Sequence, residues 1–384
     1  MTGARRLFSR FKSIVQRKDG PARSPAEEIP RQQVGGKNEQ PGKLQDQVGN
    51  KDLDLADLPS EPASARSVSK ELPAFFIVGR AKSGTSWLRS IMDSHPEVLC
   101  INEGRFFGRD YRGRGGVIPR SLYGALADSE YLKTWVKRSP WSRREDTEEH
   151  MRNLTRHVID YFMTKKLAKT GKKVAGDKTP LIGTEVIAEI AEIYPDAKVI
   201  HIVRDGRDVV ISSMHHIWNN AKDRGGPNDL EPEVLAKRDA YRQDPEGFLA
   251  RGESIFVDGQ LAGTARNWAN LVGKASRDGR ALLEDNYVEV RYENLLERPV
   301  YETRRLLRFL GADDSEQIAQ RCVELTSFER MSKRERGQED SSSFFRKGVA
   351  GDWKTVFNDK DKRDFKVVAG DLLIELGYER DNDW

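Results

Sequence analysis

The sequence predicts an α/β fold in three layers, with a central parallel sheet flanked by helices on both faces. Two observations support this prediction. From residue 72 onward, short apolar runs alternate with segments whose apolar residues recur at helical spacing. The first of these runs also breaks into a loop of small residues that opens a helical pattern, which is the arrangement of many α/β anion sites. The 384 residues are enough for one large α/β domain or two smaller ones.

The elements follow one another along the chain in a regular order. Apolar runs predict four strands, at residues 75–78, 173–175, 199–203 and 287–291. Helical spacing predicts eight helices, at residues 86–94, 146–168, 182–194, 206–217, 258–279, 300–310, 316–325 and 360–376. Because strands separated by helices pair in parallel, we expect the ligand loops at the carboxyl ends of the strands. Residues 219–257, rich in Gly, Pro, Asp and Arg, interrupt this order and are predicted to be an insertion or lid near the site.

The segment before residue 72 is predicted to lie outside the folded domain, which we expect over residues 72–384. Residues 1–19 read as a basic amphipathic segment, because residues 4–18 carry six Arg and Lys, no acid, and apolar side chains at helical spacing. Such a segment suits an anionic membrane surface; a transit peptide and a solvated tail are the alternatives. Residues 20–71 are predicted to be a disordered linker, since they contain too little apolar surface to order themselves. The expected location is cytoplasmic, with peripheral contact at a membrane surface as a further expectation.

Composition excludes several classes of function. A formal net charge of +4 is small for this size and does not suggest a nucleic-acid-binding protein. The two cysteines, Cys100 and Cys322, do not form a secreted disulfide framework, and the six histidines lack the spacing of metal ligands. No apolar run is long enough to span a bilayer.

The loop after the first strand is the strongest functional signal. It reads Gly-Arg-Ala-Lys-Ser-Gly-Thr-Ser-Trp over residues 79–87. The free N–H groups of the following helix, its positive dipole end and Lys82 together predict an anion site. It is not a triphosphate P-loop, because Gly84 is followed by Thr85 rather than by lysine. A smaller phosphate or phosphosulfate group fits better, and the alternative is a plain strand–turn–helix junction with a surface lysine.

Three further segments point to the same ligand. The Asp-Lys-Thr-Pro string at residues 177–180 follows the second strand. Arg204 leaves the third strand, and Ser212 lies eight residues further on. An arginine and a hydroxyl so placed hold one phosphate, unless Asp205 only caps the helix and the arginines are exposed. The Arg-Lys-Gly string at residues 346–348 predicts a second phosphate clamp, with an ordinary surface loop as its alternative.

Together these motifs resemble those of the sulfotransferases that use 3′-phosphoadenosine 5′-phosphosulfate (PAPS), over residues 75 to about 357. The resemblance implies a P-loop-like three-layer fold, PAPS as cosubstrate, adenosine 3′,5′-bisphosphate as product, and no metal. It implies contacts of the phosphosulfate with the loop after the first strand, of the 3′-phosphate with residues near 204–212 and 346–348, and of adenine with three aromatic side chains. The cosubstrate-binding residues it implies are Arg80, Lys82, Ser83, Gly84, Thr85, Ser86, Trp87, Arg204, Ser212, Tyr292, Phe328, Arg346, Lys347 and Gly348.

Members of the family differ in the residue that acts as catalytic base, and the sequence resembles only some of them at this point. Cytosolic small-molecule members carry a histidine after a Lys-Thr pair, whereas here Pro180 follows. The string is instead similar to carbohydrate sulfotransferases, in which, as in tyrosylprotein enzymes, a glutamate about twenty residues after the phosphosulfate loop acts as base. Glu103 lies 21 residues after Lys82. The resemblance thus implies Lys82, Glu103 and Lys178 as catalytic residues, with Glu103 as general base. The alternatives are a structural ion pair of Glu103 with Arg105 or with a loop arginine, and His215, His216 or Asp177 as base.

The sequence therefore predicts a sulfotransferase that acts on an acceptor hydroxyl, of a glycan, a glycolipid, a peptide tyrosine or another alcohol. Candidates for the acceptor pocket are Phe106, Phe107, Trp141, Trp218 and the insertion 219–257, with a place in the core or on the surface as the alternative for each. Two other classes compete with this prediction. One is a P-loop-type nucleotide-dependent kinase or phosphotransferase, and the other is a protein that binds the nucleotide without chemistry. The sequence indicates neither the acceptor nor the oligomeric state.

Overall fold

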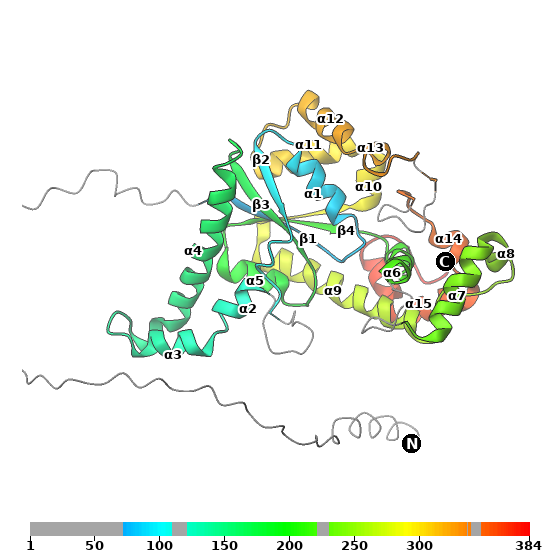
Figure 1. Ribbon diagram of the computed structural model, residues 1–384, viewed down its shortest axis with the longest axis horizontal. Helices are drawn as coiled ribbons and strands as arrows, with labels where there is room; N and C mark the ends of the chain where they lie inside the picture. The colour runs from blue at the N-terminus through cyan, green and yellow to red at the C-terminus, as the bar shows by residue number, and fades with distance from the viewer. Residues whose placement is uncertain (1–71, 110–120, 221–229, 336, 339–346) are drawn as a thin grey trace, which may run out of the picture. The chain divides into compact units, whose positions relative to one another are not determined.

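Five parallel strands form the central sheet of the computed structural model, in the order β2-β3-β1-β4-β5 (Figure 1). The strands are β1 (Ala74–Gly79), β2 (Val98–Asn102), β3 (Val174–Pro180), β4 (Lys198–Val203) and β5 (Tyr287–Arg291). The structure describes residues 72–109, 121–220, 230–335, 337–338 and 347–384. The predicted segments 1–19 and 20–71, and Arg346, lie outside the described residues.

Helices cover both faces of this sheet, so the predicted three-layer α/β fold is confirmed. The described helices are α1 (Thr85–Asp93), α2 (Leu122–Leu126), α3 (Glu130–Arg138), α4 (Thr147–Leu167), α5 (Val186–Ile193), α6 (Gly206–Asn220), α7 (Pro232–Gln243), α8 (Pro245–Ala250), α9 (Gln260–Leu282), α10 (Tyr292–Glu297), α11 (Pro299–Leu310), α12 (Glu316–Leu325), α13 (Phe328–Ser332), α14 (Trp353–Val356) and α15 (Asp359–Glu375). Two short 3₁₀ turns lie at Arg144–Asp146 and Glu284–Asn286.

Alternation along β1 shows how the layers form. Phe75 and Ile77 point to one face and pack with α1, α10, α11 and α12. Phe76 and Val78 point to the other face and pack with α2, α4, α5 and α9. Since successive side chains of a strand point to opposite faces, a continuous apolar run such as β1 belongs in the middle of a sheet that is covered on both sides.

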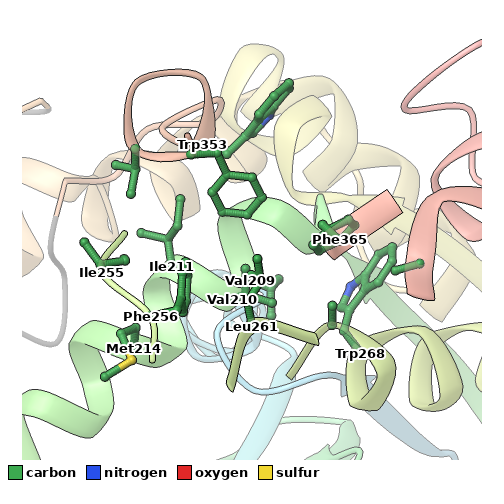
Figure 2. Close-up of a cluster of buried hydrophobic side chains, with 14 of the residues drawn as sticks. Val209, Val210, Ile211, Met214, Ile255, Phe256, Leu261, Trp268, Trp353 and Phe365 are labelled. Carbon is green, nitrogen blue, oxygen red and sulfur yellow. The ribbon is translucent and has the colours of Figure 1, made fainter. Parts of the chain in front are cut away.

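A third apolar cluster lies beside the sheet and joins α6, α9, α14 and α15 (Figure 2). Residues 230–257, which make up most of the predicted insertion, contribute α7, α8 and the segment after them to this cluster. Tyr241, Phe248, Ile255 and Phe256 from these residues are buried. This part of the insertion therefore supports the core. The role of the insertion as a lid stays a prediction.

The fold places the four candidate acceptor residues differently. Phe106, Phe107 and Trp218 are buried in apolar clusters, whereas Trp141 is 86% exposed. Across the described residues, no helix is both long enough and apolar enough to cross a membrane. Nor do the described residues bring three His, Cys, Asp or Glu side chains together as a metal site would.

Candidate active site

The loop between β1 and α1 is tightly folded. The Ser83 N–H donates to the Arg80 carbonyl at 3.0 Å. Gly84, the N-cap of α1, has φ 91°, and a Cβ there would lie 2.5 Å from the ring of Tyr292. Glycine is thus required both by the left-handed backbone and by the close ring. Lys82 also has positive φ, 75°, a conformation that costs free energy and is common in ligand-binding loops.

This loop opens onto a pocket with about 830 Å³ of empty space, part of it exposed to solvent. The pocket lies where β1 and β4 end, at the edge where a parallel sheet presents its ligand loops. Its lining residues are Lys82, Gly84, Thr85, Ser86, Trp87, Arg204, Ser212, Tyr292, Leu296, Phe328, Met331, Lys347, Gly348 and Val349.

All of the described residues that the sequence assigned to the cosubstrate line this one pocket, except Arg80 and Ser83. The Arg80 Nε donates to Asn267 Oδ1 on α9 at 2.9 Å, and burial lowers the pKa of its guanidinium. The Ser83 hydroxyl is buried and has no hydrogen-bond partner among the described residues. A buried hydroxyl without a partner inside an anion loop is suited to a ligand or an ordered water.

The sequence did not indicate Leu296, Met331 and Val349. Leu296 lies four residues after Tyr292 on α10, and Met331 lies three residues after Phe328 on α13. Side chains three or four residues apart on a helix share a face, so each aromatic residue could have identified its apolar neighbour. No such signal was available for Val349.

Aromatic side chains form the walls of the pocket. The rings of Trp87 and Tyr292 are 5.9 Å apart at an interplanar angle of 75°. The Trp87 Nε1 donates to the Thr326 carbonyl at 2.9 Å, which fixes its ring. On the opposite loop, Gly348 has φ 67°, and a Cβ there would lie 2.4 Å from the ring of Phe328. Flat apolar walls of this kind suit a planar heterocycle.

Arg204 joins the two loops of the pocket. Its Nη1 donates to the Lys82 carbonyl at 3.1 Å, and its Nη2 donates to the Val349 carbonyl at 3.2 Å. The guanidinium lies 4.5 Å from the centroid of the Tyr292 ring. Its Nε is buried and has no hydrogen-bond partner among the described residues. A cation held in this way remains able to donate to an anion in the pocket.

The sequence left open that Asp205 only caps the helix after β4 and that the neighbouring arginines are exposed. The first part of this alternative is correct and the second is wrong. Asp205 does accept the backbone N–H of Arg207, at 2.9 Å, near the start of α6. Arg204 and Arg207, however, are buried rather than exposed, with 8% and 2% of their surface accessible. The structure therefore contradicts the expectation of solvated arginines.

Glu103 and Lys178 form an ion pair at the same edge of the sheet. Lys178 pairs in register with Asn102, the residue before Glu103, and the Glu103 N–H donates to the Lys178 carbonyl at 3.1 Å. The lysine side chain is buried, whereas 49% of the glutamate side chain is exposed. Neither residue lines the pocket described above. The ion pair with Arg105 that the sequence left open is not formed among the described residues, because Lys178 takes that place.

Asp177 holds the turn that carries Glu103. Its Oδ1 accepts the Gly104 N–H at 2.7 Å, and its Oδ2 accepts the Thr179 hydroxyl at 2.6 Å. Glu103 has φ 55°, so the chain reverses there in a left-handed conformation. Asp177 is fully buried, and burial raises the pKa of its carboxyl to about 6. The structure therefore places Asp177 behind the turn as a support for it.

The other candidate bases have different surroundings. The ring of His215 is buried and lies 5.0 Å from the Trp218 ring and 5.5 Å from the Tyr241 ring. For His216, burial and then the charge of Lys82 lower the pKa of the imidazole.

Comparisons with known proteins identify the family to which the chain is similar. A family model described as "Sulfotransferase domain" matches residues 72–377. A protein-tyrosine sulfotransferase of Drosophila melanogaster is 26% identical over 249 residues, which are 64% of this chain and 39% of the relative. A flavonol sulfotransferase-like protein of Flaveria bidentis is 23% identical over 267 residues, which are 64% of this chain and 79% of the relative. The chain thus spans about two fifths of the length of the first of these relatives.

Solved structures are also similar to the chain. The mouse sulfotransferase SULT7A1 complexed with PAP is 19% identical, with a TM-score of 0.42 over 80% of this chain and 85% of that chain. The sulfotransferase domain of the Synechococcus PCC 7002 olefin synthase is 15% identical, with a TM-score of 0.43 over 79% of this chain and 95% of that chain.

Proposed function

The chain belongs to the sulfotransferase family, whose domain model matches residues 72–377, and from this we propose that it is a PAPS-dependent sulfotransferase. It transfers the sulfuryl group of PAPS to an acceptor hydroxyl and releases adenosine 3′,5′-bisphosphate. One observation carries the proposal. A single pocket brings together the anion loop at the start of α1, the cations Arg204 and Lys347, and an aromatic slot.

The chemistry of the pocket matches a nucleotide with phosphates at two positions. The N–H groups of Gly84, Thr85 and Ser86 at the start of α1 would hold the 5′-phosphosulfate, because a helix N-terminus favours an anion. Arg204, Ser212 and Lys347 would hold the 3′-phosphate through charge-assisted hydrogen bonds.

The base of the nucleotide would lie in the aromatic slot. Trp87, Tyr292 and Phe328 offer flat faces, and base–aromatic stacking contributes about 1–3 kcal/mol per base. Arg346, which the resemblance also implies, stays a predicted ligand of the 3′-phosphate. Arg80 and Ser83 stay predicted ligands of the 5′ side.

The transfer is an in-line displacement at sulfur. A bond forms between the acceptor oxygen and sulfur while the bond from sulfur to the bridging oxygen breaks, and the bridging oxygen keeps the electron pair. The acceptor proton passes to the Glu103 carboxylate, which Lys178 orients. Lys82 stabilises the charge that develops on the leaving oxygen. The protein's contribution is therefore positioning and charge stabilisation, as in phosphoryl transfer.

The acceptor is an alcohol or a phenol, since Glu103 has to remove a hydroxyl proton. A glycan, a glycolipid and a peptide tyrosine all satisfy this condition. A kinase is the less favoured function, because the loop carries Thr85 where a triphosphate loop has lysine.

Calorimetry with nucleotides tests the proposal. We expect the protein to bind adenosine 3′,5′-bisphosphate more tightly than ADP or ATP, with and without magnesium. Preference for ATP in the presence of magnesium would contradict the roles of Arg204, Ser212 and Lys347 and would favour the kinase. If the bisphosphate is preferred, transfer of labelled sulfate from PAPS to panels of glycans and tyrosine peptides would identify the acceptor.

A further inference from the structure

A buried arginine beside the pocket is enclosed by two tryptophans. Arg207, on the first turn of α6, has 2% of its surface accessible. The centre of its guanidinium lies 3.7 Å from the ring centroid of Trp353 and 4.3 Å from that of Trp384. Its charge is balanced by Asp205 at 2.7 Å and by Glu379 at 2.5 Å. A planar guanidinium can stack on aromatic faces and form ion pairs at its edge, which an ammonium group cannot do in this way.

Trp353 belongs to the loop that carries Lys347 and Gly348 of the pocket. Asp208, next to Arg207, accepts the N–H of Gly351 at 2.7 Å and that of Trp353 at 3.1 Å. Lys347 itself forms an ion pair with Asp352 at 2.8 Å. Figure 2 shows the Trp353 side chain at the apolar cluster formed with α6. The pocket loop is therefore fastened to α6 at its Trp353 end.

Trp384 encloses the other side of the arginine. Its ring lies 5.4 Å from the Trp353 ring and 6.2 Å from the Phe365 ring of α15. Figure 1 shows this end of the chain beside α14. Tyr378, earlier in the same segment, donates to Glu293 Oε2 at 2.9 Å, and Glu293 follows Tyr292 of the aromatic slot. Residues 378–384 thus contact supports of both the phosphate side and the aromatic side of the pocket.

We propose that Arg207, Trp353 and Trp384 form a clamp that fixes the loop Lys347–Val349 and thereby sets the affinity for the 3′-phosphate of the nucleotide. None of the three lines the pocket, so they are positioning residues. The inference rests on the proposed function, because it assumes that Lys347 and Arg204 face a 3′-phosphate. Arg204 connects the loop to the rest of the site, since it donates to the Val349 carbonyl.

The test compares two nucleotides that differ only in the 3′-phosphate. Adenosine 3′,5′-bisphosphate and AMP are titrated into the full chain and into Trp384→Ala by calorimetry. We expect the Kd of the bisphosphate to rise about tenfold, the order expected for loss of a desolvated cation–π contact. The Kd of AMP should change by less than about twofold, since AMP makes no 3′-phosphate contact. Trp384→Phe keeps a ring over Arg207 and should recover most of the lost affinity.

Two controls separate this effect from a general loss of stability. Trp135→Ala removes an exposed tryptophan of the same size, and Met163→Ala weakens the core on α4 without touching the clamp. Both should leave the ratio of the two Kd values unchanged. Equal losses for the two nucleotides in Trp384→Ala, or unchanged affinity for both, would overturn the clamp. A wild-type protein without any preference for the bisphosphate over AMP would overturn the nucleotide assignment and, with it, the clamp.

Discussion

At the residue scale, the proposed base combines a constrained backbone with an exposed side chain. Glu103 sits in a left-handed turn, pairs with Lys178, and still exposes half of its side chain. Glu103→Gln keeps the shape but cannot take a proton. We expect it to lower the rate of sulfuryl transfer by about a hundredfold or more, the usual range for loss of a general base. The affinity for adenosine 3′,5′-bisphosphate should stay within about twofold, since Glu103 does not line the pocket.

Single-turnover transfer from PAPS and calorimetry, measured on the same preparation, check this prediction. Glu130→Gln, which changes an exposed glutamate of α3, is the matched control and should behave as wild type. An active Glu103→Gln enzyme would remove Glu103 from the mechanism and direct attention to His216.

The raised pKa of Asp177 leads us to expect that the stability of the protein depends on pH. Its folded-state pKa of about 6 lies above the ordinary value of 3.8, so the folded protein keeps this proton to higher pH than the unfolded chain. The stability that it contributes is therefore fully present below about pH 4 and is lost as the pH rises through about 6. The loss is on the order of 2–3 kcal/mol, from the size of the shift.

Asp177→Asn cannot lose this proton, and its amide oxygen can still accept the Gly104 N–H. We expect the variant to gain stability relative to wild type between pH 4 and pH 7, by the amount just given. Urea unfolding of both proteins at several pH values measures the difference. A difference that does not change with pH would show that Asp177 is ionised throughout this range.

At the scale of the element, the sequence predicted four of the five strands and the longest helices, and it missed β2, the shortest helices, α3 and the 12-residue α7. Helices such as α4 and α9 are long enough to show the apolar spacing that identifies a helix. β2 was missed although its first four residues, Val98–Ile101, are apolar and its first three are buried. Short helices such as α10 gain most of their stability from packing on other elements, and packing is not visible in the local sequence.

The candidate site was predicted where one motif supplies several residues. Lys82, residues 84–87 and the pair Arg204 and Ser212 line the same pocket because parallel strands end at the same edge. The partner of Glu103 was not predictable, because it depends on the register of β2 against β3, and β2 itself was missed. The clamp around Arg207 was not predictable either, because its two tryptophans lie far from α6 in the sequence.

The loop Lys347–Val349 offers a test at the scale of the element. Gly348→Ala places a methyl group 2.4 Å from the Phe328 ring at a φ of 67°. We expect a loss of stability of about 1–3 kcal/mol from the strained backbone. Because either the Phe328 ring or the loop that carries Gly348 must move, the Kd of adenosine 3′,5′-bisphosphate should also rise, by about tenfold or more.

Gly171→Ala is the matched control for this substitution. Gly171 has a similar φ of 70°, but nothing lies within 4 Å of the added carbon, and the residue is outside the pocket. It should therefore reproduce the loss of stability without the loss of affinity. Thermal unfolding and calorimetry measure the two effects, and a Gly348→Ala protein that binds the nucleotide as tightly as wild type would contradict the close packing of this loop on Phe328.

At the scale of the whole molecule, the strand order explains why the site lies at β1. β1 pairs with β3 on one side and β4 on the other, so the loop after it meets loops from both halves of the sheet. Lys178 and Glu103 come from the β3 side, and Arg204 comes from the β4 side. The phosphate loop after β1 is thus positioned between the proposed catalytic pair and the proposed 3′-phosphate site, as expected at a switch point of a parallel sheet.

The division of the chain leads to the last prediction. Residues divide into two units, Met1–Arg66 and Ser67–Trp384, and the second contains every described residue of the site. A protein that begins at Ser67 should therefore bind adenosine 3′,5′-bisphosphate as tightly as the full chain. Membrane contact is one of the three interpretations of residues 4–18, and on it each basic side chain would contribute about 1 kcal/mol at an anionic lipid surface.

Removal of residues 1–66 should hence abolish binding to vesicles that contain phosphatidylserine. Neither the full chain nor the truncated protein should bind neutral vesicles. Co-sedimentation at two salt concentrations measures this, because an electrostatic contact weakens as salt rises. A full chain in which four of the basic residues are replaced by glutamine, at positions 5, 6, 10 and 12, should behave like the truncated protein. If the truncated protein still sedimented with anionic vesicles, the membrane contact would have to lie within residues 67–384. Residues 4–18 would then lose the role that their charge pattern predicts.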